Sequence, residues 1–438
     1  MNDRKVSNYR FQNWGKTIDS TVQELIYPNS EDSLAEIVRS ASKQGKNIRV
    51  VGSGHSWTHL VKTNQILVSL DDWQGELEVN KPMLQATVKA GTKLFRLSEF
   101  LFSNGMAMEN MGDIDRQSIA GALSSGTHGT GIQFGVLANQ LREITFVNGK
   151  GELVTCSPEN NLPLFKAAQV SLGSLGIITR MKLQAVPAYH LRCVKKKESF
   201  DEVLAQIDKH KKENRNFELF WFPYSDTVAT KYLNETKEPA DQPGFGKYLV
   251  DVVYENGTFY MISELTRMFN GLAKSVSLLA AGGISSGVEI APSHKIYASP
   301  RLVRFYEMEY GVPSEYGPEV LRKIRDFIAK EKINVHFPIE YRYVKGDDIY
   351  ISPAHGRETC FISVHMYLGM PYKAYFDGLE KIFNQYDSRP HWGKMHTLTA
   401  KDLKPKYPKW DDFLNFREEQ DPNGVFLNDY LKSIFFGK

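Results

Sequence analysis

The sequence predicts a fold of mixed helices and strands, organised in two or three domains. The chain has 438 residues, enough for more than one domain with a sizeable core. Hydrophobic residues make up 42% of the chain and charged residues 24%, values that are ordinary for a globular protein. Strand-like and helix-like patterns alternate up to about Pro187. These observations exclude a fibrous or disordered protein.

The first part of the chain contains one clear helix and several strands. Ser30 can cap a helix whose first turn carries Glu31 and Asp32, and Gly45 ends it. Apolar residues recur inside it at helical spacing: Leu34, Ile37, Val38 and Ala41. The run from Ile48 to Val51 reads as a buried strand. Further strand-like runs are expected at 65–70, 84–90 and 141–147, and another begins at Gly176.

The second part, from about Ala188, also mixes the two element types. Residues 217–222 are expected to form a strand and residues 319–332 a helix. The polar stretch 234–246, with Pro239 and Pro243, is expected to be a loop. Residues 337–344 and 360–367 read as two neighbouring strands, because the 15 residues between them suit a long connection. No internal repeat is found.

Charge and cysteine usage narrow the class of protein. The net charge of +3 is the small difference between 54 basic and 51 acidic residues, which gives no argument for nucleic-acid binding. Three cysteines are too few for a disulfide framework and suit a reducing cytoplasm. The N-terminus has no signal-peptide pattern, and the best membrane candidate, 275–288, is too short. We therefore expect a cytoplasmic protein with no transmembrane segment.

The most informative stretch is a glycine turn after the strand that ends at Val51. It reads Gly52-Ser53-Gly54-His55-Ser56. A strand followed by glycines lets the backbone turn sharply and present its N–H groups to an anion. His55 places an imidazole nucleophile at the mouth of that turn. The pattern is neither a Rossmann fingerprint nor a Walker loop, and it predicts a phosphate cradle for a nucleotide cofactor.

A second block rich in small residues runs from Ser118 to Gly131. A helical turn over 118–125 would let a flat ligand approach the backbone closely. The glycines that follow, with hydroxyl groups between them, indicate a second anion-binding turn. A flexible surface loop is the alternative, but Ile119, Ala120, Ala122 and Leu123 have the spacing of core residues and favour a packed segment.

Candidate catalytic side chains lie on the two neighbouring strands of the second part. Glu340 and Arg342 are two residues apart and therefore share one face of an otherwise apolar strand. A carboxylate and a guanidinium in such a run must be paired or bound to a ligand. On the other strand Ser363, His365 and Tyr367 share a face. A structural ion pair and a buried core histidine are the alternatives.

A catalytic metal site is not expected. His55 and His59 are four residues apart, but they lie at a glycine turn and no glutamate stands between them. Zinc hydrolases place such a pair on a helix with an intervening glutamate. His391 and His396 are also close in sequence without that pattern.

Taken together, these motifs resemble the aldonolactone oxidase group of the vanillyl-alcohol-oxidase-type flavoproteins. The glycine turn, the 118–131 block and the C-terminal run Arg389-Pro390-His391-Trp392-Gly393-Lys394 carry the match. The tail 421–428 is also similar to that family's ending. The resemblance covers nearly the whole chain, and the related alditol oxidases share part of it.

The resemblance implies an α+β fold and FAD as the cofactor. Residues 1–187 would form a PCMH-type FAD-binding domain of two subdomains, 188–387 a substrate or cap domain with an antiparallel sheet and flanking helices, and 388–438 a segment returning to the FAD domain. A covalent bond from His55 to the 8α carbon of the flavin is expected. The expected cofactor-binding residues are Gly52, Ser53, Gly54, His55, Ser56, Ser118, Gly121, Ser124, Gly126, Thr127, His128, Gly129, Gly131 and Ile178.

The resemblance also implies the reaction, a hydride transfer from the substrate to flavin N5. The expected catalytic residues are Glu340, Arg342, His365 and Lys394, and Tyr367 and Ser118 are expected to contact the substrate. An aldono-1,4-lactone is the expected substrate, because the run 367–372 resembles bacterial gulonolactone dehydrogenases. An alditol remains an alternative, since alditol oxidases share His365, and so does a flavin-binding protein without turnover. Oxygen, a quinone or a cytochrome could each accept the electrons.

Overall fold

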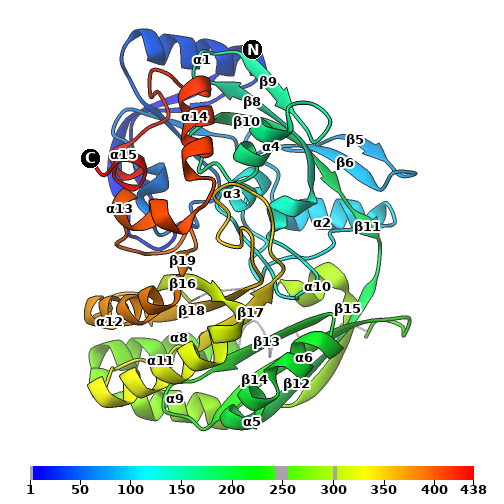
Figure 1. The fold of residues 1–438 in the computed structure, drawn as a ribbon, viewed down its shortest axis with the longest axis vertical. Coiled ribbons are helices and arrows are strands. Elements are labelled where there is room, and N and C mark those ends of the chain that lie inside the picture. Colours follow the sequence, from blue (N-terminus) through cyan, green and yellow to red (C-terminus); the bar gives the residue numbers. More distant parts are fainter. Residues whose placement is uncertain (1–2, 242–254, 299–302) are drawn as a thin grey trace.

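The computed structural model describes residues 3–241, 255–298 and 303–438, and three main sheets organise them (Figure 1). Two smaller sheets are built from the first 184 residues, and one sheet of eight strands is built from residues 190–390. The smaller sheets lie in the upper half of Figure 1 and the large sheet in the lower half. The expected mixture of helices and strands, an α+β fold, is confirmed.

The first sheet has four strands in the order β1-β2-β4-β3. Its members are β1 (Arg4–Gln12), β2 (Asp19–Tyr27), β4 (Ile66–Ser69) and β3 (Ile48–Val51). β4 runs parallel to both β2 and β3, so a crossover connection is required. Helix α1 (Glu31–Lys43) supplies it between β2 and β3, and the Ser30 side chain accepts a hydrogen bond from the backbone N–H of Ser33 at its N-terminus. The predicted cap and strand are confirmed.

The second sheet has five antiparallel strands in the order β5-β6-β10-β8-β9. They are β5 (Glu76–Asn80), β6 (Gln85–Lys89), β10 (Gly176–Gln184), β8 (Leu141–Asn148) and β9 (Leu153–Cys156). The connections carry helices α2 (Leu94–Ser103), α3 (Ile119–Ser124) and α4 (Leu162–Gln169). A short pair, β7 (Met106–Ala107) with β11 (Val186–Pro187), leads toward the large sheet.

The third sheet is antiparallel throughout, in the order β15-β12-β14-β13-β17-β18-β16-β19. Its strands are β15 (Gly287–Pro292), β12 (His190–Ser199), β14 (Thr227–Thr236), β13 (Asn216–Trp221), β17 (Ile339–Val344), β18 (Thr359–Tyr367), β16 (Phe305–Pro313) and β19 (Arg389–Pro390). β17 pairs with β18, with Glu340 opposite Ser363. The two predicted neighbouring strands are therefore confirmed.

Helices cover the outer face of this sheet and leave its inner face toward the smaller sheets. The helices of this part are α5 (Phe200–Ala205), α6 (Ile207–Glu213), α8 (Glu255–Met268), α9 (Ala273–Gly282), α10 (Ser293–Tyr297), α11 (Gly317–Glu331) and α12 (Lys373–Phe383). Figure 1 shows α5, α9 and α11 on the side away from the smaller sheets. The tyrosines at 341 and 343 are buried, and a Cβ on Gly317 of α11 would meet the hydroxyl of Tyr341. The alternate residues of β17 therefore point inward.

The last helices return to the first sheet. They are α13 (Ala400–Leu403), α14 (Trp410–Gln420) and α15 (Asp429–Phe436), and Figure 1 shows them in the half of the molecule that holds the smaller sheets, with α14 nearest to α1. The backbone N–H of Ile48 in β3 donates to the Val425 carbonyl at 2.8 Å. The buried guanidinium of Arg49 donates to the carbonyls of Leu60, Leu172 and Phe426. The chain end is thereby tied to both smaller sheets.

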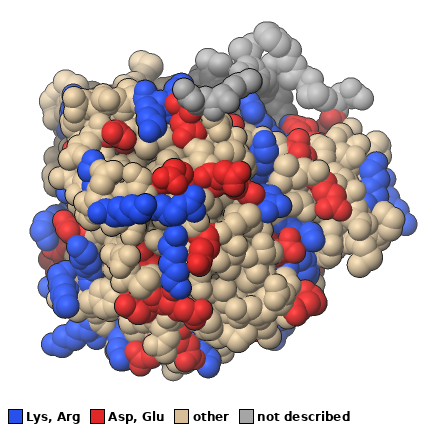
Figure 2. Space-filling view, turned by 90° about the horizontal axis from the view of Figure 1, so that it is seen from above, with Lys and Arg blue, Asp and Glu red and all other residues tan. Residues whose placement is uncertain are grey.

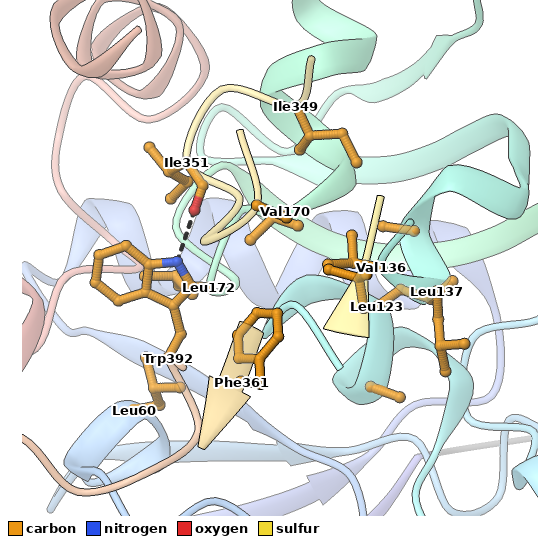
Figure 3. Packing of buried hydrophobic residues seen from close by; sticks show 14 of the residues in the cluster. Leu60, Leu123, Val136, Leu137, Val170, Leu172, Ile349, Ile351, Phe361 and Trp392 are labelled. Atoms are coloured by element: carbon orange, nitrogen blue, oxygen red, sulfur yellow. Dashed lines mark hydrogen bonds between the residues drawn. The ribbon is translucent and has the colours of Figure 1, made fainter. Parts of the chain in front are cut away.

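One continuous apolar core joins the parts of the chain. Figure 3 shows Trp392, from the segment after β19, packing among side chains of the first part and of the β17–β18 connection. Its indole Nε1–H donates to the Ile351 carbonyl at 2.7 Å. Phe361 of β18 approaches the same cluster. The large sheet and the smaller sheets are therefore held together by buried apolar surface, which is costly to expose.

The structure changes some details of the sequence predictions. The expected loop over 234–246 is wrong at its start, because β14 continues to Thr236; residues 242–246 lie outside the described residues. The membrane candidate 275–288 is divided, since α9 ends at Gly282 and Val288 belongs to β15. Within the described ranges no helix is long and apolar enough to cross a membrane.

Surface charge is mixed on the face shown in Figure 2, where basic and acidic side chains alternate over short distances. Cys156, Cys193 and Cys360 are all buried and unpaired with one another. Burial raises the pKa of the Cys156 thiol to about 12, so this side chain stays neutral.

Candidate active site

A cavity lies where the glycine turn after β3 meets helix α3. The turn residues Gly52 to Ser56 line one side of it. Gly54 has φ +66°, a left-handed conformation that favours glycine. A Cβ added to Gly52 would overlap Ser118 Oγ, so the turn and the start of α3 meet only because position 52 has no side chain. The predicted cradle is present as a local backbone arrangement.

The other side of the cavity comes from α3 and from the start of β10. Of the expected cofactor residues, nine line it: Gly52, Ser53, Gly54, His55, Ser56, Ser118, Gly121, Ser124 and Ile178. Sequence reasoning missed Val50, Leu70, Gln117, Gly173 and Gly176, which also line it. Gly173 has φ +64°. The sequence signal for this side of the cavity was the pair of glycines, Gly173 and Gly176, just before and at the start of the strand β10.

The remaining expected cofactor residues lie elsewhere. Gly126, Thr127, His128, Gly129 and Gly131 are not among the residues that line the cavity. The chain turns away at Gly126, which has φ +76°, and the backbone N–H of Gly131 donates to the Tyr343 carbonyl of β17 at 2.7 Å. This half of the small-residue block joins α3 to the large sheet. It is closely packed, because a Cβ on Gly129 would collide with the carbonyl of Met111, which lies between β7 and α3.

His55 is half-buried at the edge of the cavity. Its Nδ1 has no hydrogen-bond partner among the described residues. Burial, and then the positive charges of Lys394 and Lys93, lower the pKa of His55 to about 4. The ring is therefore neutral at pH 7, and a buried polar atom without a partner costs free energy. The unpartnered nitrogen and the glycine cradle together fit a bound, flat, anionic cofactor.

The inner face of the large sheet carries a second group of charges. Arg342 Nη2 lies 2.6 Å from Glu340 Oε2 and 2.6 Å from Asp113 Oδ2. Arg342 Nε lies 2.9 Å from Glu218 Oε2 of β13. Burial alone would lower the pKa of Arg342, but the carboxylates outweigh it and raise the pKa well above its ordinary value. Glu340 and Arg342 therefore form a buried ion pair on this sheet face, and neither is among the residues that line the cavity beside His55.

Strand β16 adds two acidic residues that sequence reasoning missed. Glu307 contacts the ammonium of Lys394 and accepts a hydrogen bond from Ser363 Oγ at 2.6 Å. Glu309 lies 3.1 Å from His128 Nε2. The signal was present, because Glu307 and Glu309 alternate in an aromatic strand as Glu340 and Arg342 do.

His365 and Tyr367 differ in their surroundings. His365 lies 3.5 Å from Glu307, and its Nδ1 lies 2.9 Å from the Pro338 carbonyl. The Tyr367 hydroxyl donates to the carboxylate of Glu264 on helix α8. The Tyr367 hydroxyl is therefore already occupied by a contact outside the ionic group.

An aromatic group connects the cavity with the sheet. The Trp57 indole N–H donates to the Phe305 carbonyl of β16 at 2.7 Å, and Lys394 Nζ lies 4.5 Å above the Trp57 ring. Trp14 contacts both the His55 ring, at 5.6 Å between centroids, and the Phe305 ring, at 5.2 Å. Lys394 thus lies between the His55 end of the cavity and the acidic residues of β16.

One cluster of the described residues has the composition of a metal site: His128, Glu309 and His391 bring donor atoms within 4.8 Å of one another. The ring of His391, however, accepts the backbone N–H of Gly393 at Nδ1. A neutral ring that accepts at Nδ1 carries its proton on Nε2, whereas a metal-binding histidine donates its second ring nitrogen to an acceptor. His391 therefore has the arrangement of a hydrogen-bonded histidine.

Two family models match different parts of the chain. The family model described as D-arabinono-1,4-lactone oxidase matches residues 181–434, and the model described as FAD binding domain matches residues 22–157. The chain is 37% identical to an L-gulono-1,4-lactone dehydrogenase of Mycobacterium tuberculosis, over 97% of this chain and 98% of the relative.

More distant relatives and a solved structure extend the comparison. An L-gulonolactone oxidase of Mus musculus is 33% identical over 98% of each chain. A D-arabinono-1,4-lactone oxidase of Kluyveromyces lactis is 29% identical over 96% of this chain and 95% of the relative. The crystal structure of cholesterol oxidase from B. sterolicum superposes with a TM-score of 0.83 at 18% identity, over 99% of this chain and 97% of that chain. At that identity the structural likeness shows the fold alone.

Proposed function

This chain belongs to the D-arabinono-1,4-lactone oxidase family, and we propose that it oxidises an aldono-1,4-lactone with FAD as the electron acceptor. The substrate would be L-gulono-, L-galactono- or D-arabinono-1,4-lactone, and the product an ascorbate-type compound. The observation that carries the proposal is the position of Lys394, which contacts Glu307 of the sheet and whose charge adds to burial in lowering the pKa of His55.

The cavity supplies what the cofactor needs. The backbone N–H groups of Gly52 to Ser56 would hold the pyrophosphate, and the small residues Gly121 and Ser124 of α3 would admit the flat ring. When bound, FAD supplies the acceptor for a hydride from the substrate carbon. Everything else in the reaction is positioning and electrostatics, which this chain's side chains provide.

The inner sheet face supplies the charges that the substrate needs. We assign Glu340 to hold the substrate hydroxyl by accepting its hydrogen bond. Arg342 and Lys394 are the cations that stabilise negative charge as it forms on that oxygen. Both are oriented by carboxylates: Asp113 and Glu218 contact Arg342, and Glu307 contacts Lys394. Replacing Glu340 with Gln would slow flavin reduction and leave the flavin in place.

The anaerobic reaction with candidate substrates tests the function. Purified protein is mixed without oxygen with L-gulono-1,4-lactone, D-arabinono-1,4-lactone and xylitol, and the visible absorbance of the flavin is followed. Rapid bleaching by a lactone and not by xylitol supports the lactone assignment. Bleaching by xylitol alone would make the protein an alditol oxidase, the alternative that the lactone names of its relatives do not favour. No bleaching by any of them would contradict both.

We further propose that His55 bonds the flavin covalently. The support is its neutral ring, whose buried Nδ1 has no partner among the described residues at the cavity edge. Precipitating the native protein with acid should leave the yellow colour in the pellet, and His55→Ala should release it into the supernatant. His59→Ala is the matched control, because this exposed histidine lies four residues on and does not line the cavity. Colour released from the native protein would refute the bond.

The domain limits and the setting of the reaction are also proposals. We place the FAD domain at 1–187, the substrate domain at 188–387 and the returning segment at 388–438. The first limit is supported by the large sheet, whose first strand in sequence begins at His190, whereas β19 at the start of the returning segment still pairs within that sheet. We propose a cytoplasmic location, since all three thiols are free. Oxygen, a quinone or a cytochrome is the terminal acceptor; reoxidation of the bleached flavin by air would identify an oxidase.

A further inference from the structure

The two buried carboxylates of β16 have different partners. Glu309 is paired with His128. Glu307 uses each of its oxygens separately: Oε2 contacts the ammonium of Lys394, whereas Oε1 accepts from Ser363 Oγ at 2.6 Å and lies 3.5 Å from His365 Nε2. Glu307 therefore joins two of the side chains to which the catalytic roles are assigned.

The contacts of His365 define its protonation. Nδ1 lies 2.9 Å from the Pro338 carbonyl, which can only accept, so this nitrogen carries a proton. Nε2 faces the Glu307 carboxylate, which also accepts when ionised. Both ring nitrogens therefore face acceptors. This arrangement favours the imidazolium form, because only that form carries an N–H donor on each nitrogen. The edge-on ring of Phe305, at 4.8 Å between centroids, excludes water from this side.

The ammonium of Lys394 is held in a comparable way. Its contact with Glu307 is the short one, and Glu309 Oε2 lies farther away at 4.0 Å. The Trp57 ring stands 4.5 Å from the ammonium. Removing the Glu307 charge would leave Lys394 near a carboxylate that already has its own histidine.

We propose that Glu307 is a positioning residue, which fixes Lys394 in place and keeps His365 as an imidazolium, so that both cations face the substrate oxygen. The catalytic consequence of this inference rests on the proposed function. It assigns His365 the role of a fixed cation and not of the base that takes the hydroxyl proton.

The electrostatic surroundings agree with this assignment. Burial by itself lowers the pKa of His365, but the hydrogen bond and charge of Glu307, with a smaller contribution from Glu340 of β17, outweigh it and raise the pKa. Lys394 acts on Glu307 from the segment after β19 and helps to hold the pKa of Glu307 well below its ordinary value.

Two neutral rings complete the group. The charge of Glu307 also acts on His55 and on His391, but burial dominates in both. It lowers the pKa of His55 to about 4 and that of His391 to about 3. These rings are therefore uncharged at pH 7, and His365 is the ring whose protonation Glu307 controls.

The experiment measures the ring state of His365 directly in the FAD-loaded protein. The chain has 11 histidines, so ¹⁵N-histidine spectra are recorded at pH 7 and the His365 signals are assigned from their loss in His365→Gln. We expect both ring nitrogens to be protonated in the native protein and one to be bare in Glu307→Gln. Glu309→Gln is the matched control, since it removes a buried carboxylate of the same strand and should leave His365 an imidazolium.

Two outcomes would overturn the proposal: a neutral His365 in the native protein at pH 7, or an imidazolium that persists in Glu307→Gln. The first needs no variant, so the test holds even if Glu307→Gln fails to fold. Glu307→Asp is the second variant; it retains the charge and should retain the imidazolium.

Flavin bleaching by L-gulono-1,4-lactone across pH gives the kinetic readout. We expect Glu307→Gln to lower the rate about 10²-fold and to move the alkaline limb of the pH profile to lower pH. An unchanged limb would contradict the role of Glu307. If no lactone bleaches the native protein, the proposed function fails, whereas the ring state still decides the role of Glu307.

Discussion

Arg342 and Glu340, two residues apart on β17, form a buried ion pair with 2.6 Å between Nη2 and Oε2. The same guanidinium also contacts Asp113, in the segment between β7 and α3, and Glu218 of β13. A single guanidinium thus contacts three carboxylates that are far apart in sequence. Removing it would leave their negative charges close together without the cation that lies between them.

Replacing Arg342 with Met should therefore destabilise the protein. Breaking a buried ionic group by removing one partner costs about 3–5 kcal/mol, because charges remain buried and uncompensated. The free energy of unfolding from denaturant titration measures this. Arg10→Met is the control: Arg10 makes a comparable 2.6 Å pair with Asp19, but its side chain is 74% exposed, so the unfolding midpoint should hardly change. Equal losses in both variants would argue against the ionic group.

Replacing Gly52 with Ala should empty the cavity of cofactor. The added Cβ would overlap Ser118 Oγ and lie 3.1 Å from Ser118 Cβ, so the hydroxyl must rotate and the turn must shift against helix α3. We expect the flavin-to-protein absorbance ratio to fall at least several-fold while the protein remains folded. Gly282→Ala, in α9, is the control, because nothing lies within 4 Å of a Cβ there. A normal flavin content in Gly52→Ala would show that the turn is not the cradle.

Acid should destabilise the folded protein, because the Glu309 carboxylate becomes protonated. Burial by itself raises the pKa of Glu309, but the charge and hydrogen bond of His128 outweigh it and hold the pKa at about 2. Because the folded value is lower than the unfolded one, near 4.5, this carboxylate contributes stability above pH 4.5 and loses it as the pH falls toward 2. Thermal melts at pH 5 and pH 3 should show a smaller drop for Glu309→Gln than for the native protein. The exposed Glu36→Gln should behave as the native protein does, and identical drops in all three would contradict the assignment.

Local structure was largely predictable. The Ser30 cap, the strand before Gly52 and the two strands that carry Glu340 and His365 all follow from spacing and side-chain chemistry within a few residues. The glycine turn was predictable for the same reason, since a turn at positive φ such as that at Gly54 favours glycine. The family, and with it FAD and the lactone class, was also evident from these motifs.

Contacts between segments that are distant in sequence were not predictable in the same way. The run of small residues predicted a helical turn over 118–125 that admits a flat ligand and a second anion-binding turn after it. Only the first half lines the cavity, because the backbone turns at Gly126 and the second half pairs with β17. Glu307 and Glu309 were not predicted as site residues. Their spacing shows that they share one face of a strand, but it does not show which strand lies beside it.

The sequence by itself determined the elements, the cofactor cradle and the residue types of the site. Only the tertiary structure decided which charges meet: it brings Asp113, Glu218 and Glu340 around Arg342, and it sets Glu307 between Lys394 and His365. The physical reason is that secondary structure depends on neighbours in sequence, whereas the protonation and orientation of a buried ionic group depend on partners that strand order and register bring together from the whole chain.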